Sequence, residues 1–178
     1  MINAALVAMD FDALLPRMER PEYTEEYQGF YYLTGMHGGC DNAELSYIIR
    51  DHDEEKLKYR VDYINRAADE INRRYGAGVA VAETGFDYKN MRCIIEKHFH
   101  LIENARKAIE MAGGIPVSKP VRGGTDGCVL SFMGLPCPNL GTGGYNFHGK
   151  FEFACIEQMD SAVEMIKNLA VLYGELRK

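Results

Sequence analysis

The sequence predicts an α+β fold in its first half and an α/β arrangement in its second half. Two observations lead to this prediction. Residues 1–96 give the element order helix, strand, strand, helix, strand, whereas residues 97–178 alternate helices with short apolar runs. The chain has 178 residues, of which 47% are hydrophobic and 26% charged, a composition typical of folded domains. We therefore expect two domains, 1–96 and 97–178.

The first half contains one element with a strong helical pattern. The expected elements are a helix over 2–15, strands over 29–36 and 42–50, a helix over 54–75 and a strand over 78–84. In the second helix, apolar residues recur every three or four positions, at Leu57, Val61, Ile64, Ala68, Ile71 and Tyr75. Asp51 or Asp53 can cap its start, and Gly76 stands where a C-terminal glycine cap belongs.

This element order resembles an incomplete two-layer unit. A ferredoxin-like unit runs strand, helix, strand, strand, helix, strand. Residues 1–96 reproduce that order without the first strand. We therefore expect a partial ferredoxin-like domain whose first strand is supplied by a partner or lies elsewhere.

The second half offers little sheet. The expected elements are a helix over 97–112, a strand at 115–117, a helical turn over 128–134, a strand at 136–140 and a helix over 157–176. Two or three short strands cannot cover two long helices. We expect this half to be part of a larger α/β layer.

Composition excludes several functions. The net charge of −6 and the lack of a basic stripe argue against nucleic-acid binding. No apolar run is long enough to span a bilayer, and the N-terminus does not read as a signal peptide. The five cysteines are an odd number with no C-x-x-C pair, as expected of reduced thiols in a cytoplasmic protein.

Two glycine-rich loops carry the candidate site. In PVRGGTDG, Thr125 and Asp126 precede a predicted helix and can cap it. In GTGGYNFHGKFE, His148 can act as a metal ligand or as a general acid–base group, with Glu152 as its hydrogen-bond partner. The alternatives are that the loops are ordinary turns and His148 a surface residue. Neither loop fits a phosphate-binding motif.

Arg50 closes the apolar strand LSYII and precedes an acidic run. Its guanidinium can form a surface ion pair of little consequence. Alternatively, it is held at the edge of the sheet to bind a carboxylate. The residues alone leave both interpretations open.

The run PVRGGTDGCVLSFMGLPCPNLGTGGYNFHGKFE closely resembles the C-terminal signature of the peptidase T family. These are tripeptide aminopeptidases among the co-catalytic zinc exopeptidases. The earlier run PEYTEEYQGFYYLTGMHGGCDNAELSYIIRDHD resembles the lid, or dimerisation, domain of that family. The resemblance extends over essentially the whole chain and in the family's order.

The resemblance implies specific roles. His148 matches the family's last zinc ligand, and Arg50 and Arg122 match arginines that hold substrate carboxylate at the site. It further implies two zinc ions as cofactors, a peptide substrate and a homodimer formed through the lid.

The chain also departs from the family pattern. The other metal ligands lie earlier in the family, in a His-x-Asp motif, a Glu-Glu pair and two further aspartates, and no His-x-Asp occurs here. The two Glu-Glu pairs, Glu25-Glu26 and Glu54-Glu55, fall inside the lid match. We therefore expect the C-terminal portion of a longer zinc aminopeptidase, with no catalytic residue in this chain and no activity on its own. A non-catalytic dimerisation module is the alternative, and a nucleotide-binding fragment ranks last.

Overall fold

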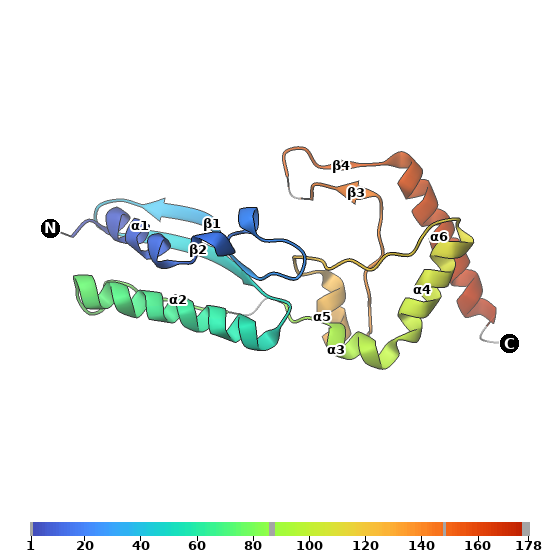
Figure 1. Ribbon diagram of the computed structural model, residues 1–178, viewed down its shortest axis with the longest axis horizontal. Helices are drawn as coiled ribbons and strands as arrows, with labels where there is room; N and C mark the ends of the chain where they lie inside the picture. The colour runs from blue at the N-terminus through green and yellow to red at the C-terminus, as the bar shows by residue number, and fades with distance from the viewer. Residues whose placement is uncertain (1, 86–87, 148, 176–178) are drawn as a thin grey trace. The chain divides into compact units, whose positions relative to one another are not determined.

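The computed structural model describes residues 2–85, 88–147 and 149–175. The chain divides into two compact units. Unit 1 consists of Met1–Asp87 and Pro120–Gly123, and unit 2 consists of Tyr88–Lys119 and Gly124–Lys178 (Figure 1). The boundary expected between residues 96 and 97 falls inside unit 2.

Unit 1 contains four of the five elements predicted for the first half. They are helix α1 (Ala4–Leu14), strands β1 (Phe30–Gly38) and β2 (Ala43–Arg50), and helix α2 (Glu54–Tyr75). Two short 3-10 helices, η1 (Arg17–Glu19) and η2 (Pro21–Tyr23), link α1 to β1. Asp53 caps α2 by accepting a 3.0 Å hydrogen bond from the Lys56 amide, and Gly76 ends the helix with a positive φ of 117°.

A small apolar core joins these elements. Tyr31 of β1 packs with Leu15 and with Ile64 and Ala67 of α2. Side chains from β2 and α1 surround this cluster, so both helices cover the same face of the sheet. The strands are antiparallel, with a register shift between Leu33 and Gly35 that leaves Thr34 without a strand partner.

Polar contacts tie α1 and α2 to the rest of unit 1. Asp12 accepts hydrogen bonds from Arg20 at 2.6 Å and from the Tyr47 hydroxyl at 2.8 Å. Arg60 of α2 pairs with Asp51 at 2.9 Å and with Glu19. Because Arg60 and Asp51 are both largely buried, removing either would leave an unpaired buried charge.

Unit 2 is mainly helical. It contains α3 (Arg92–Ile95), η3 (Glu96–His98), α4 (His100–Met111), α5 (Asp126–Phe132), β3 (Gly144–Tyr145), β4 (Phe153–Ala154) and α6 (Ile156–Glu175). Helix α4 packs on α6 through the fully buried Ala108, whose carbonyl oxygen accepts a 3.4 Å hydrogen bond from Asn168. Strands β3 and β4 form a small antiparallel hairpin in which the rings of Tyr145 and Phe153 stack at 5.1 Å. The sequence analysis did not predict this hairpin.

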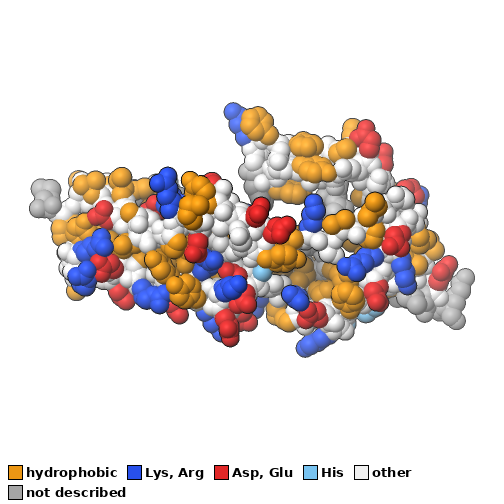
Figure 2. Space-filling model, viewed as in Figure 1, with side chains coloured by type: hydrophobic (Ala, Val, Ile, Leu, Met, Phe, Trp, Pro, Cys, Tyr) orange, Lys and Arg blue, Asp and Glu red, His pale blue; other side chains and the backbone are white. Residues whose placement is uncertain are grey.

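Three predicted strands are wrong. Residues 78–84, 115–117 and 136–140 are all described, and none of them forms a strand. A strand is defined by the ladder it forms with a neighbour, and in the described part of the chain these segments pair with no strand. In the first two, some apolar side chains are strongly exposed: Ile115 retains 87% and Val81 79% of its accessible surface, whereas most of 136–140 is half-buried. Figure 2 shows such apolar side chains among the charged ones on the visible surface.

The predicted fold class is confirmed. Helices and two small antiparallel sheets make up the described part of the chain. In that part, no helix is both long enough and apolar enough to cross a membrane. All five cysteines are described, and all five are free thiols.

The core tyrosines yield a first prediction. The Tyr31 side chain is 2% exposed, and its hydroxyl has no hydrogen-bond partner in the described residues. Replacing it by Tyr31→Phe removes an unsatisfied buried group, so the free energy of unfolding should stay constant or rise by up to about 1 kcal/mol. Tyr47→Phe removes the hydrogen bond to Asp12 and should lower the free energy of unfolding by about 1–2 kcal/mol. Urea denaturation measures the free energy of unfolding of both variants. A marked loss of stability in Tyr31→Phe would contradict the prediction.

A second prediction concerns alkaline pH. Burial raises the pKa of Tyr31 from 10.0 to about 12. A pKa raised by folding means that the protonated tyrosine stabilises the fold, fully below pH 10 and progressively less as the pH rises toward 12. Unfolding measured from neutral pH to pH 12 should therefore show stability falling above pH 10, with a smaller slope in Tyr31→Phe. Tyr23→Phe, which alters an exposed tyrosine, is the control and should keep the original slope.

Candidate functional site

Arg122 is held by two contacts within unit 1. Its Nη1 donates to the Thr24 carbonyl oxygen and its Nη2 to the Thr24 hydroxyl, each at 2.6 Å. The guanidinium lies over the ring of Phe30, with 4.8 Å between the central carbon and the ring centroid. Its Nε is buried and has no hydrogen-bond partner in the described residues. The guanidinium plane is thus fixed, and the Nε–H donor has no partner among the described residues.

Arg50 ends β2 directly opposite Phe30 of β1. Cross-strand partners have Cβ atoms about 5 Å apart and share one face of the sheet. The cross-strand pairing of Arg50 with Phe30 and the stacking of Arg122 on Phe30 therefore bring the two predicted substrate-binding arginines to the same aromatic residue. Whether either arginine binds substrate stays a prediction.

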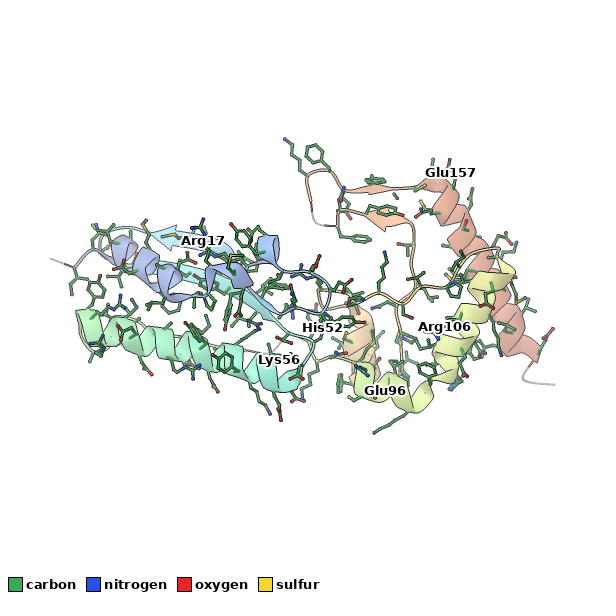
Figure 3. All side chains as sticks on the ribbon, in the orientation of Figure 1. Arg17, His52, Lys56, Glu96, Arg106 and Glu157 are labelled. Atoms are coloured by element: carbon green, nitrogen blue, oxygen red, sulfur yellow. The ribbon has the colours of Figure 1, made fainter. Side chains whose placement is uncertain are left out.

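The segment after Arg50 leads into α2. Figure 3 labels His52, which lies in this segment, and Lys56, which lies in the first turn of the helix. The His52 ring contacts the Tyr27 ring edge-on, with 5.1 Å between the centroids. This contact joins the segment after β2 to the loop before β1, close in sequence to Thr24 and Phe30.

Two nearby arginines suit a carboxylate ligand. A guanidinium binds a carboxylate best in bidentate fashion, through two parallel N–H donors. In Arg122, both terminal nitrogens bond Thr24 and the Nε–H is buried, so an incoming carboxylate would have to displace a contact of this side chain. A carboxylate binding the Nε and Nη2 edge would compete with the Thr24 hydroxyl.

Sequence reasoning missed Thr24 and Phe30. Thr24 lies 98 residues before Arg122 in the chain. No local pattern links positions so far apart, and a threonine in a polar connecting segment carries no signal of its own. Only the fold brings the Pro120–Gly123 segment into unit 1.

The glycines of the TDG loop serve close packing in unit 2. A Cβ on Gly124 would lie 2.0 Å from the Tyr88 ring, and one on Gly127 would lie 2.5 Å from the Cys137 carbonyl oxygen. The predicted capping by Thr125 is wrong. Thr125 occupies the N-cap position of α5, but its hydroxyl lies 3.5 Å from the Cys128 sulfur and does not cap the helix.

The predicted metal ligand His148 lies outside the described residues. In residues 2–85, 88–147 and 149–175, no three His, Cys, Asp or Glu side chains form a group that could hold a metal ion. These residues therefore do not by themselves fit a zinc site. The bond expected between His148 and Glu152 also falls outside the described part of the chain.

Comparison with known proteins identifies the relatives. The chain is 46% identical over 175 residues to the peptidase T of Alkaliphilus oremlandii and 47% identical over 175 residues to that of Clostridium perfringens. Each match covers 98% of this chain and 43% of the relative. The chain matches a C-terminal portion of peptidase T. It thus spans less than half the length of these peptidase T relatives.

A solved structure agrees at the level of fold. The aminopeptidase PepT of Bacillus cereus superposes with a TM-score of 0.58 at 19% sequence identity, covering 94% of this chain and 44% of that one. No family model matches the chain. The resemblance to peptidase T predicted from the sequence motifs is therefore confirmed, as is the expectation that only a portion of it is present.

The Arg122 contacts yield a third prediction. In Arg122→Lys, a single ammonium replaces the planar fork, so one bond to Thr24 and the stacking on Phe30 are lost. Unfolding should cost about 1 kcal/mol less. Lys119→Arg, at an exposed position, is the control. An unchanged free energy of unfolding in Arg122→Lys would show that Thr24 does not anchor this segment.

Proposed function

We propose that this chain forms the substrate-binding C-terminal portion of a zinc-dependent aminopeptidase that releases the N-terminal residue of tripeptides. The observation that carries this proposal is the match at 46% identity across 98% of the chain to peptidase T. The proposed setting is the cytoplasm, which suits five free thiols.

In this proposal, Arg50 and Arg122 hold the substrate's carboxylate. Their shared neighbour Phe30 supports it, because Arg50 is its strand partner and Arg122 stacks on its ring, and two cations near one residue favour an anionic ligand. Binding the far end of a short peptide fixes the position of its first peptide bond. Thr24 would then set the orientation of the Arg122 guanidinium as a positioning residue.

The proposed metal chemistry depends on residues beyond this chain. A catalytic zinc ion needs about three protein ligands, and His148 is the one ligand proposed here. The described residues include no group of three His, Cys, Asp or Glu side chains that could hold a metal ion. We expect the isolated chain to hydrolyse no tripeptides.

A fourth prediction tests this function in a complete enzyme. A chimera would carry the N-terminal part of the Alkaliphilus oremlandii peptidase T ahead of this chain. The chimera should hydrolyse tripeptides in the presence of zinc, whereas the isolated chain should not. Arg50→Ala and Arg122→Ala in the chimera should raise KM or lower kcat by about tenfold, the effect of losing one charge-assisted contact.

The matched control is Arg73→Ala, which removes an exposed arginine paired with Glu70 on α2. It should leave both constants unchanged. Tripeptidase activity of the purified isolated chain would contradict the proposal that most of the metal ligands lie outside this chain. Unchanged KM and kcat in both arginine variants would contradict their role in binding substrate.

The second candidate function is a non-catalytic dimerisation module. Exposed apolar side chains on α1 favour it: Leu6 is 60% exposed and Met9 58%. In this alternative, unit 1 pairs with a second copy as a homodimer. Both functions expect a homodimer through the lid, so sedimentation of Leu6→Glu beside the unmodified chain tests whether α1 forms the contact, whereas tripeptidase activity of the chimera separates the two functions.

A further inference from the structure

The loop before β1 packs tightly against the end of β2. A Cβ on Gly29 would lie 2.6 Å from the Arg50 carbonyl oxygen, so only glycine allows the two backbones to approach this closely. Arg50 is the last residue of β2 and one of the two predicted substrate-binding arginines. The loop therefore borders the candidate site directly.

A turn fixes the conformation of this loop. The Glu25 amide donates to the Gln28 side-chain oxygen, and the Gln28 amide donates to the Glu25 carbonyl oxygen, both at 2.9 Å. Between them, Glu26 has a left-handed backbone conformation with a φ of 46°, which is uncommon outside turns for residues other than glycine. The backbone of the next residue, Tyr27, is thus held in place, whereas its side chain is 61% exposed.

Tyr27 and His52 form an aromatic pair close to both arginines. Their ring centroids are 5.1 Å apart, with one ring edge-on to the other. His52 follows Arg50 by two residues, so their Cα atoms are at most about 7 Å apart. Tyr27 follows Thr24, which bonds Arg122, by three residues. The pair therefore lies in the same small region of unit 1 as the arginines.

The strand pairing places Arg50 on the sheet face away from α2. Tyr31 and Ile49 belong to the core that α2 covers. Side chains alternate along a strand, so their neighbours Phe30 and Arg50 point to the opposite face. Arg122 stacks on Phe30 there. A ligand can approach this face without disturbing the core of unit 1.

We propose that Tyr27 and His52 form a subsite for the side chain of the substrate's C-terminal residue, with a preference for an aromatic side chain. The proposal rests on the proposed function, in which Arg50 and Arg122 hold the carboxylate of that same residue. Because a side chain and its carboxylate leave one Cα, the group that accepts the side chain must lie beside the group that binds the carboxylate.

The chemistry of the pair selects the ligand class. Aromatic rings attract one another in edge-to-face or offset arrangements, with centroids about 4.5–7 Å apart. Tyr27 and His52 already adopt such an arrangement, and the exposed part of the Tyr27 ring can accept a further ring. A glycine at the C-terminus of the substrate gains none of this contact, so the subsite discriminates between the two.

The test measures binding to the full chain and requires no catalysis. N-acetylphenylalanine and N-acetylglycine both imitate the C-terminal residue of a peptide, and N-acetylphenylalanine amide lacks the carboxylate. Titration followed by the NMR signals of the His52 ring gives the Kd of each compound. N-acetylphenylalanine should bind about fivefold more tightly than N-acetylglycine, the effect of one added aromatic contact. The amide should bind at least about tenfold more weakly than the acid, because a charge-assisted contact is lost.

Matched variants assign the preference to the aromatic pair. Tyr27→Ala should make the two acids bind equally and leave the Kd of N-acetylglycine unchanged. Tyr27→Phe keeps the ring and should keep the preference. His52→Ala should reduce the preference and His52→Phe should retain it, and these two variants are titrated by calorimetry because the His52 signal is lost. The control is Tyr59→Ala, which removes a tyrosine of similar exposure (58%) on α2 and should change neither Kd.

The arginine variants separate this proposal from the proposed function. Arg122→Ala should weaken binding of both acids about tenfold and leave their ratio unchanged. This result, together with a preference that is lost in Tyr27→Ala, supports the subsite. Equal Kd values in the unmodified chain, a preference that survives both alanine variants of the pair, or the absence of binding overturns it.

Binding that depends on neither Arg50 nor Arg122 also overturns the subsite, because the ring would then not lie beside the carboxylate. The proposed function is judged by a different measurement, the tripeptidase activity of the chimera. An active chimera together with equal Kd values would overturn the subsite alone, whereas an inactive chimera would count against the proposed function.

Discussion

The requirement that every strand has a partner governs this structure. Two strands supply the sheet of unit 1, and α1 and α2 can bury apolar surface on one face of it. The polar contacts of Asp12 and Arg60 then hold the helices at this face. In the described part of the chain, residues 79–82 and 115–117 have no partner strand, and Val81 and Ile115 in these segments are 79% and 87% exposed. The sheet edge, the core and the position of Arg50 all depend on this one pairing.

Local patterns were sufficient to predict the longer helices α1, α2, α4 and α6, the short helix α5 and the β1–β2 hairpin, but not the short helix α3. The repeat from Leu57 to Tyr75 and the residues Asp53 and Gly76 predicted α2 with its observed bounds. The strand predictions failed at 78–84, 115–117 and 136–140, because alternation and apolar content describe a segment and not its neighbours. The same limit applies to the site. The sequence singled out Arg50 and Arg122, but not Thr24 or Phe30, whose relation to Arg122 arises only from folding.

The site and the family match concern different parts of the proposed enzyme. The match to peptidase T concerns 43% of each relative, and the metal ligands of that family are expected mainly outside this portion. The described residues of this chain place Arg122 over the Phe30 ring and Arg50 opposite Phe30 in the sheet. In our proposal, these arginines recognise the charged end of a short peptide and take no part in bond cleavage.

The assignment of Pro120–Gly123 to unit 1 has a consequence for chain connectivity. Residues on both sides of this segment belong to unit 2, so the backbone passes from one unit to the other after residues 87, 119 and 123. A nick after residue 87 alone would leave residues 120–123, which belong to unit 1, on the same piece as unit 2. Each unit is thus discontinuous in sequence, and neither can be cut out or exchanged as one continuous stretch of the chain.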